Sequence, residues 1–411
     1  MKREGLKKVT LGLVAVGLSL TLLVTGAMPS HATPAEKEVR VGIRAIFTGP
    51  LASVGVPWSH GQLDCIRYIN EERGGIGGIN IHPMWEDTKG LVPGTITAHK
   101  RFKAAGVVLE TEASSTPTET LAPMMQRDEM PLLWDASITR LMVTEPLQWT
   151  FGLSPQIELW IPYYMKWVLD NWTEPRPPRL GYIFYEFASG YMVLEGCEFA
   201  DEMGFEFVGY EVTSFTPIDT TTEWLRLAAK EPDFIFMSCY GMAAVCFVKD
   251  AARLGIQEKG ITLCCGPNTL SEDILRIVGR DGEGWYITSA LPSNVETEAP
   301  GVKLAMHYGN KYRGLEEVTQ WYLTGWLQAL VGGESIRLAI QQVGYENLTR
   351  RAIRDGLASI KDFDTGLVPP SYMSDEKPWF SDVIKIHQVQ EGKMLPVTDW
   401  MPPPGVTYPI R

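Results

Sequence analysis

The chain has 411 residues and a formal charge of −12 at pH 7, because 49 Asp and Glu outnumber 37 Lys and Arg. Nucleic-acid binding depends on clustered basic side chains, so this acidic balance and the lack of a basic run after residue 32 argue against it. The length and the 45% hydrophobic composition suffice for two domains with sizeable cores.

The first 32 residues have the pattern of a secretory signal. Four basic residues within 2–8 precede an apolar run at 9–27, and Ser30-His31-Ala32 supplies a site with small residues. We expect cleavage after Ala32 and therefore an exported protein. An uncleaved membrane anchor is the alternative, because the apolar run is nearly long enough to span a bilayer. No cysteine lies near the site, so a lipid-anchored form is not indicated.

From Val39 to about Ser154, short β-rich runs alternate with helical patterns. Strands are expected at 39–46, 79–86, 106–110, 131–134 and 149–153, and helices at 57–72, 93–105 and 117–128. Alternation at this spacing predicts a mostly parallel sheet with helices on both faces. The loop that follows the first strand lies where open α/β folds bind their ligands.

A second series of the same kind starts near residue 156. Helices are expected at 156–171, 190–203, 221–230 and 241–254, with strands at 180–185, 206–212, 233–238 and 261–265. A strand at 284–288, helices at 296–313, 319–342 and 346–358, and a strand at 383–389 with a hairpin turn at 390–393 complete the chain. The sequence therefore predicts two Rossmann-like α/β halves that follow one another.

The tail after these halves is too short for a third domain. The economical interpretation is that the late helices return to the first half and the terminal strands to the second. The expected lobes are then 38–154 plus 285–363, and 155–284 plus 364–411.

Six cysteines in an exported chain raise the question of disulfides. Cys239 and Cys264 end apolar runs that we interpret as neighbouring parallel strands, so a bridge there is geometrically allowed. Buried free thiols are the default interpretation. The chain has no Cys-x-x-Cys and no Cys/His metal spacing, so neither a metal nor a cofactor is expected.

Several segments carry a family likeness in a fixed order. They are Thr48-Gly49-Pro50-Leu51-Ala52 through Gly55, Ile69-Asn70-Glu71-Glu72 with Gly74-Gly75-Ile76, Trp85-Glu86-Asp87-Thr88-Lys89, Ser114-Ser115-Thr116 with Ala122-Pro123, and Met130-Pro131-Leu132-Leu133. Later matches are Ala251-Ala252-Arg253-Leu254-Gly255, Gly266-Pro267 and Gly282-Glu283-Gly284. The chain from about 35 to 400 thus resembles the type I periplasmic binding proteins of ABC importers, in particular the branch that includes the leucine/isoleucine/valine-binding protein.

The resemblance implies two lobes joined by three crossovers, which close over a solute held in the cleft. It implies a periplasmic receptor whose partners are a small-molecule solute, such as an amino acid or other small carboxylate, and the membrane permease of an ABC transporter. Strand-end loops and helix N-termini in such a cleft offer backbone N–H groups to an anionic ligand.

Ser114, Ser115 and Thr116 are the first candidate ligand-binding residues, because their hydroxyls precede a helix that opens at Pro117. The alternative is that Ser115 or Thr116 only caps this helix, and the two roles are compatible.

Asp135, Ala136 and Ser137 follow the next strand, where the family usually has small residues that bind the ligand's carboxylate and ammonium. A simple turn is the alternative. Asn268 aligns with a position that in the amino-acid binders commonly holds a glutamate paired with the ammonium. Burying an ammonium without an opposite charge is costly, so either the ligand lacks an amine or another acid replaces the glutamate. Asp135 is the best candidate.

Tyr240 falls where the family often places a pocket aromatic, and packing is the alternative. Ser189 and Val54 stand where the family often has a tyrosine and another aromatic, which indicates an altered pocket lining with more room. Trp58 and Trp134 lie beside the proposed cleft loops and are candidates for stacking on an aromatic or heterocyclic solute. Core packing is the alternative for each tryptophan.

Enzyme motifs are missing from the sequence: there is no Gly-x-Ser-x-Gly elbow, His-Glu-x-x-His helix or phosphate-binding loop. Glu110 and Glu112 resemble paired carboxylates at a strand end, which suit acid/base chemistry, but charges at a cleft rim or in solvent are the preferred interpretation. We expect a binding protein. A sensor of the same fold for amides, urea or aromatic acids and a secreted hydrolase remain alternatives, and the solute stays open.

Overall fold

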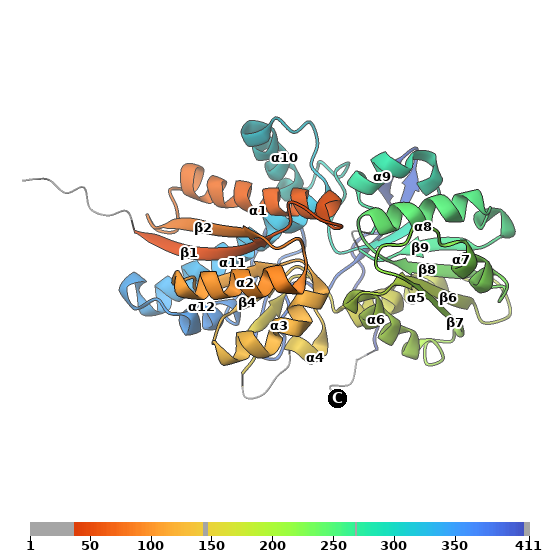
Figure 1. Cartoon of the computed structure of the whole chain (residues 1–411), viewed down its shortest axis with the longest axis horizontal. Coiled ribbons are helices and arrows are strands. Elements are labelled where there is room, and N and C mark those ends of the chain that lie inside the picture. Colours follow the sequence, from red (N-terminus) through yellow and green to blue (C-terminus); the bar gives the residue numbers. More distant parts are fainter. Residues whose placement is uncertain (1–36, 143–146, 268, 407–411) are drawn as a thin grey trace, which may run out of the picture. The chain divides into compact units, whose positions relative to one another are not determined.

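Two sheets organise the part of the chain that the computed structural model describes, which is residues 37–142, 147–267 and 269–406 (Figure 1). The expected signal at 1–32 lies outside these residues. The first sheet has the order β2 (Asn80–Asp87), β1 (Glu38–Ala45), β3 (Leu109–Glu112), β4 (Leu132–Trp134) and β5 (Thr150–Gly152). All its strands are parallel.

The second sheet repeats this arrangement and extends it at one edge. Its order is β12 (Lys393–Pro396), β11 (Lys385–Gln390), β10 (Tyr286–Ser289), β9 (Thr262–Cys265), β8 (Phe234–Ser238), β6 (Arg179–Tyr185) and β7 (Glu206–Thr213). Strands β6 to β10 are parallel and follow the same doubly wound order as the first sheet. Strand β11 pairs antiparallel with both β10 and β12. The predicted α/β fold with two mostly parallel sheets is confirmed.

Helices alternate with the parallel strands and also follow them. They are α1 (Ala52–Arg73), α2 (Val92–Ala104), α3 (Ser115–Arg127), α4 (Thr139–Met142), α5 (Trp160–Asn171), α6 (Ala188–Glu195), α7 (Thr221–Ala228), α8 (Met242–Arg253), α9 (Glu272–Val278), α10 (Pro300–Arg313), α11 (Gln320–Val343) and α12 (Arg350–Leu357). Short 3-10 turns are η1 (Ile157–Leu159), η2 (Gly196–Phe199), η3 (Gln257–Lys259), η4 (Gly279–Gly282) and η5 (Tyr345–Asn347).

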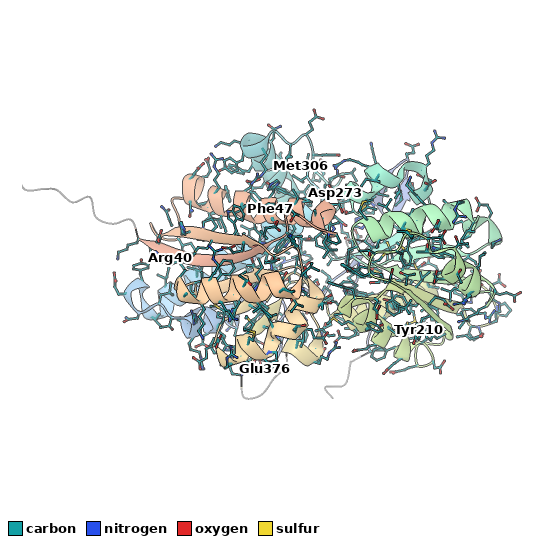
Figure 2. All side chains as sticks on the ribbon, in the orientation of Figure 1. Arg40, Phe47, Tyr210, Asp273, Met306 and Glu376 are labelled. Carbon is teal, nitrogen blue, oxygen red and sulfur yellow. The ribbon has the colours of Figure 1, made fainter. Side chains whose placement is uncertain are left out.

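The side chains of β1 point alternately to the two faces of the first sheet. Val41 and Ile43 belong to the core cluster that contains residues of α1 and α11. Gly42 points to the other face, where a Cβ atom would lie only 2.6 Å from the Phe102 ring of α2. Side chains fill the space between these layers (Figure 2). Arg44, two residues after Gly42, must therefore face the α2 and α3 side.

Two glycines let α1 and α11 cross at close range. A Cβ atom on Gly61 would lie 2.1 Å from the carbonyl oxygen of Tyr322, and one on Gly325 would lie 2.0 Å from that of Trp58. Helix α11 is thereby held against the first sheet, although it follows the parallel strands of the second. The chain thus passes three times between the sheets: after β5, after β10 and before β11.

The lobe boundaries themselves remain a prediction. Strand β10 pairs with β9 and β11, so it belongs to the second sheet, although residues 285–363 were assigned to the expected first lobe. Within the described residues, none of the helices combines the length and apolar character that a bilayer crossing requires. All six cysteines are free, so the allowed bridge between Cys239 and Cys264 is not formed.

Several expected bounds were wrong. Strand β3 begins at Leu109 and not at 106, because Gly106 has a φ of 75° and still belongs to the turn that ends α2. Helix α1 begins at Ala52 and not at 57, and includes Pro57 in its second turn, where the proline removes one intrahelical backbone donor. The four-residue helix α4 and helix α9 were not expected.

Candidate functional site

A cavity lies at the carboxyl ends of strands from both sheets. Its empty space is about 830 Å³ with the mouth included. It is lined by Ile46, Leu51, Val54, Gly55, Ala113, Ser114, Ser115, Trp134, Asp135, Ala136, Leu153, Ser154, Ile157, Trp160, Phe187, Ser189, Tyr240, Pro267, Ala290, Leu291, Trp321, Thr324 and Leu327. The loops after β1, β3, β6 and β8 all contribute, and these are the positions where the strand order of each sheet reverses. Open α/β sheets bind ligands at this point.

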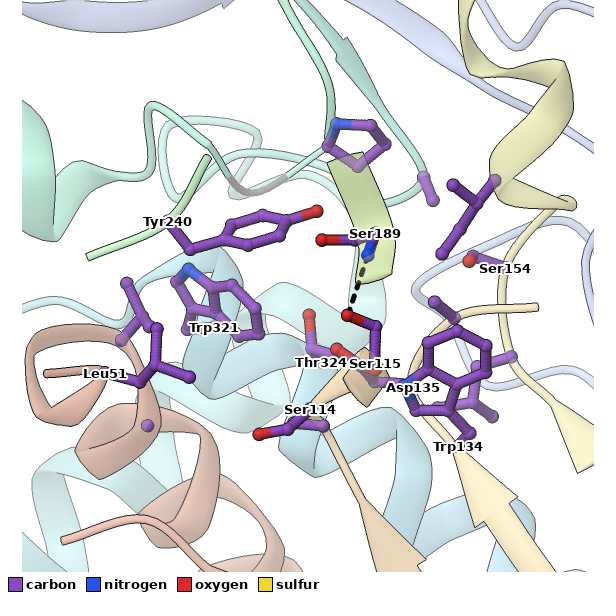
Figure 3. Close-up of a pocket in the computed structure, with 18 of the residues that line it drawn as sticks. Leu51, Ser114, Ser115, Trp134, Asp135, Ser154, Ser189, Tyr240, Trp321 and Thr324 are labelled. Atoms are coloured by element: carbon purple, nitrogen blue, oxygen red, sulfur yellow. Dashed lines mark hydrogen bonds between the residues drawn. The ribbon is translucent and has the colours of Figure 1, made fainter. Parts of the chain in front are cut away.

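The chemistry of the lining is mostly apolar and aromatic. None of the described lining residues is Lys, Arg or His, and Asp135 is the one acidic residue among them. Figure 3 shows Asp135 and Trp134 beside Ser115, with Ser189 and Tyr240 on the opposite side of the space. A small organic molecule fits this lining better than a polyphosphate, because no cation is present in it to compensate several negative charges.

Asp135 lines the cavity with a carboxyl oxygen that has no hydrogen-bond partner among the residues described. Its Oδ1 atom is buried and has no hydrogen-bond partner, and no basic side chain lies within 4.0 Å of the carboxylate in the described part of the chain. Burial raises the pKa of Asp135 well above its usual range, and the nearby Glu112 carboxylate adds to this effect. Burial and the neighbouring charge therefore disfavour the ionised form of this carboxyl, and a cation bound beside it would oppose both effects.

Tyr240 faces Asp135 from the second sheet's side of the cavity. Burial raises the pKa of the Tyr240 hydroxyl, and Asp135 is the next contributor to this shift. The Tyr240 ring packs edge-on against Trp321 of α11, with ring centroids 5.7 Å apart. The aromatic wall thus joins a strand end of the second sheet to a helix that packs on the first.

Behind the cavity, Glu110 and Glu112 belong to a buried ion cluster. Both side chains are fully buried, as is Arg44, whose Nη2 atom lies 2.5 Å from Glu110 and whose Nη1 atom lies 3.7 Å from Glu112. His99 bridges Glu110 and Asp128 at 2.8 and 3.0 Å. The prediction of rim or solvated charges was wrong, because these alternate residues of β3 face α2 and α3 and not the solvent.

Glu112 fixes the loop that leads into the cavity. Its Oε1 atom accepts hydrogen bonds from the backbone N–H groups of Ala113 and Ser114, both at 3.0 Å. Burial raises the pKa of Glu112, although Arg44 and the two backbone donors oppose this. The Glu112 carboxylate therefore stabilises the backbone conformation of residues 113–114.

Ser115 and Thr116 bind the second half of the molecule. The Ser115 hydroxyl accepts a hydrogen bond of 3.0 Å from the N–H of Ser189, as Figure 3 shows, and the Thr116 hydroxyl accepts one of 3.1 Å from the N–H of Ala188. Neither hydroxyl caps its own helix, so the capping alternative was wrong. These two contacts connect the start of α3 to the start of α6.

Ser114 and Ser189 offer free hydroxyls to the same cavity. The Oγ atoms of both residues are buried and have no hydrogen-bond partner in the described chain. Both residues line the cavity. Because a hydroxyl can donate and accept, these two groups suit either end of a polar solute.

Three expected ligand-binding residues do not line the cavity, and one cannot be placed. Thr116 binds α6, the Ser137 hydroxyl donates to the carbonyl of Ser154 at 2.6 Å, and the Trp58 indole donates to Gln328 at 2.8 Å within the core. Asn268 lies outside the described residues. Of the expected set, the structure brings together Ser114, Ser115, Asp135, Ala136, Ser189 and Tyr240.

Sequence reasoning missed the contributions of two helices. Trp160 of α5 and Trp321, Thr324 and Leu327 of α11 line the cavity. Helix α11 lies far along the chain from the loops it meets, so no local pattern points to this contact. The Gly61 and Gly325 pair, which allows the close crossing, was the available signal.

Residues 38–393 match the family described as periplasmic binding protein. The chain belongs to the periplasmic binding protein family. This is a family of binding proteins and not of enzymes. No curated protein matches the chain.

Solved structures show the shared fold of this periplasmic binding protein. A branched-chain amino acid ABC transporter protein from Thermus thermophilus with bound valine is 16% identical, with a TM-score of 0.80 over 89% of this chain and 97% of that one. A fatty acid ABC transporter substrate-binding protein from Thermomonospora curvata is 18% identical, with a TM-score of 0.78 over 89% and 92%. A solute-binding protein from R. palustris in complex with 4-hydroxybenzoate is 16% identical, with a TM-score of 0.74 over 89% and 96%.

Proposed function

We propose that this protein is a periplasmic receptor of an ABC transporter, which captures a small amino acid or related carboxylate and delivers it to the permease. The family match and the fold support a binding role. The observation that carries the proposal is the cavity at the strand ends, where a buried carboxyl oxygen of Asp135 has no hydrogen-bond partner within the described chain and can pair with the ammonium group of a solute. The similar proteins with bound valine and 4-hydroxybenzoate support a small carboxylate as the solute.

Asp135 is the proposed partner of the solute's ammonium group. A bound ammonium would compensate the carboxylate that burial and Glu112 disfavour. A hydrogen bond to a charged group contributes about 1.5–3 kcal/mol, which corresponds to roughly a 10- to 150-fold change in affinity. The positive end of the α3 dipole and the free Ser114 hydroxyl support binding of the carboxylate end.

Solute binding is coupled to closure of the two expected lobes, 38–154 plus 285–363 and 155–284 plus 364–411. The bonds of Ser115 and Thr116 to the start of α6 form only when the two halves meet. A solute that touches both halves stabilises the same arrangement, so affinity and closure are linked.

A thermal-shift screen over amino acids, aliphatic acids, aromatic acids and amides tests this function, since a ligand of the native state raises the melting temperature. Asp135→Asn should weaken amines and spare simple acids. Because the folded-state pKa of Asp135 is raised, its ionisation costs stability as the pH rises above 3.8, so the same variant should stabilise the solute-free protein at pH 7. Equal loss of amines and acids would reject the proposed role of Asp135.

Aromatic acids are the second candidate solutes, for a transport or a sensory role. Trp134, Trp160, Tyr240 and Trp321 line the cavity and offer ring faces and edges for stacking. The aromatic-acid arm of the screen decides this. The hydrolase alternative has less support, because neither Glu110 nor Glu112 lines the cavity. Turnover of a captured solute would contradict the binding role.

A further inference from the structure

Trp134 carries a polar group that the packing of the protein leaves unused. It is the last residue of β4, its side chain is 1% exposed, and it lines the cavity directly before Asp135. Its indole Nε1 atom is buried and has no hydrogen-bond partner among the described residues. An indole N–H group can only donate a hydrogen bond, so the partner that Trp134 lacks must be an acceptor atom.

The neighbouring tryptophan of the cavity differs in this respect. Trp160 also lines the cavity, but its Nε1 atom donates to the carbonyl oxygen of Pro155 at 3.3 Å. Trp326 lacks an indole partner as well, yet it stacks on Tyr68 in the core and does not line the cavity. Trp134 therefore combines a cavity position with a free donor, and Figure 3 shows it beside Ser115 and Asp135.

We propose that Trp134 is a ligand-binding residue whose indole N–H donates a hydrogen bond to an acceptor oxygen of the solute. This inference rests on the proposed function and specifies its ligand. Trp134 and Asp135 line the same cavity, so one solute can present an oxygen acceptor to the first and a nitrogen donor to the second. An α-amino acid presents such a pair, with its carboxylate for Trp134 and its ammonium for Asp135.

Valine and two fragments of it separate the two contacts. Isovalerate keeps the carboxylate and lacks the nitrogen, whereas isobutylamine keeps the ammonium and lacks the carboxylate. Trp134→Phe, which retains an aromatic ring, should weaken valine and isovalerate by roughly 10- to 150-fold, the range for a hydrogen bond to a charged group, and should spare isobutylamine. Asp135→Asn should show the opposite selectivity between the two fragments.

Trp160→Phe is the matched control, because it changes a tryptophan of the same cavity whose indole N–H already has a partner. It should affect valine and isobutylamine to the same degree. A direct readout is the indole proton resonance of Trp134, which is identified by its loss in Trp134→Phe. This resonance should move downfield when valine or isovalerate is added to the wild-type protein and stay in place with isobutylamine.

Two results overturn the inference and leave the proposed function intact: Trp134→Phe binding valine as tightly as the wild type, or an indole resonance that valine does not shift. A third result overturns both. If the wild-type protein binds no member of the four solute classes in the screen, neither the receptor role nor the Trp134 contact stands.

Discussion

Arg140 joins the two halves of the molecule through an ion pair, and this contact gives a sharp test of closure. Its Nη1 atom lies 2.6 Å from Glu195 at the end of α6, and its Nη2 atom lies 2.8 Å from Glu119 in α3. Glu119 belongs to the same half as Arg140, whereas Glu195 belongs to the other. The two glutamates therefore form a matched pair of substitutions, one within a half and one between halves.

We expect Glu195→Gln to weaken the binding of every solute by the same factor. The side chains of Arg140 and Glu195 are 33% and 26% exposed, so the ion pair is partly screened by solvent. Pairs of this kind contribute about 0.5–1 kcal/mol, which corresponds to roughly a 2- to 5-fold loss of affinity. Glu119→Gln should leave affinity unchanged, because its ion pair exists in the open and the closed form.

Titration calorimetry of both variants at low and high salt measures this effect. The loss in Glu195→Gln should shrink at high salt, where exposed charges are screened. Dissociation should be faster in this variant, because the closed form is the one that is destabilised. Equal losses in the two variants, or a loss that depends on the chemical class of the solute, would refute the assignment of this ion pair to closure.

Three further predictions concern stability. Although burial opposes it, hydrogen bonds from His387 and Lys385 lower the pKa of Glu296 from 4.5 to about 2, so its contribution is present above pH 4.5 and is lost towards pH 2. Glu296→Gln should lower the free energy of unfolding at pH 7 by up to about 3 kcal/mol, and urea titrations should show this gap closing in acid. Gly325→Ala should cost about 1–3 kcal/mol by forcing α1 and α11 apart, whereas Gly332→Ala, which meets only a flexible leucine atom at 3.2 Å, should cost less in the same assay. Glu110→Gln should cost about 3–5 kcal/mol, because it breaks a buried ion pair, and an unchanged urea midpoint would contradict this.

The order of strands and helices could be predicted from the sequence because each element has its own local pattern. Strand β8, Phe234–Ser238, begins with four consecutive apolar residues, and it lies inside the second sheet between β9 and β6. The turn between β11 and β12 was also predicted correctly, since Glu391 and Gly392 both adopt positive φ values, as a two-residue hairpin requires. One error falls at the start of α1, where Gly55 packs against Ile46 and a tertiary contact overrides local preference.

The site could be predicted only at the level of loops. Asp135 and Ser114 were placed in the cavity region because they follow parallel strands, and strand ends meet at one edge of a sheet. The direction of each side chain could not be derived in this way. Ser137 and Trp58 lie on the expected segments but bond within the core, and Trp321 reaches the cavity from a helix that no local pattern connects to it.

The hydroxyl of Ser115 lines the cavity and also fastens α3 to α6. Redesign of this receptor as a sensor for other molecules should therefore begin elsewhere on the wall. Val54 and Leu327 line the cavity and have apolar side chains that cannot hydrogen-bond across the halves. Substituting them changes the shape of the cavity and leaves the hydrogen bond between Ser115 and Ser189 intact. If closure occurs as proposed, substitutions at such residues should change which solute binds without changing the contact between α3 and α6.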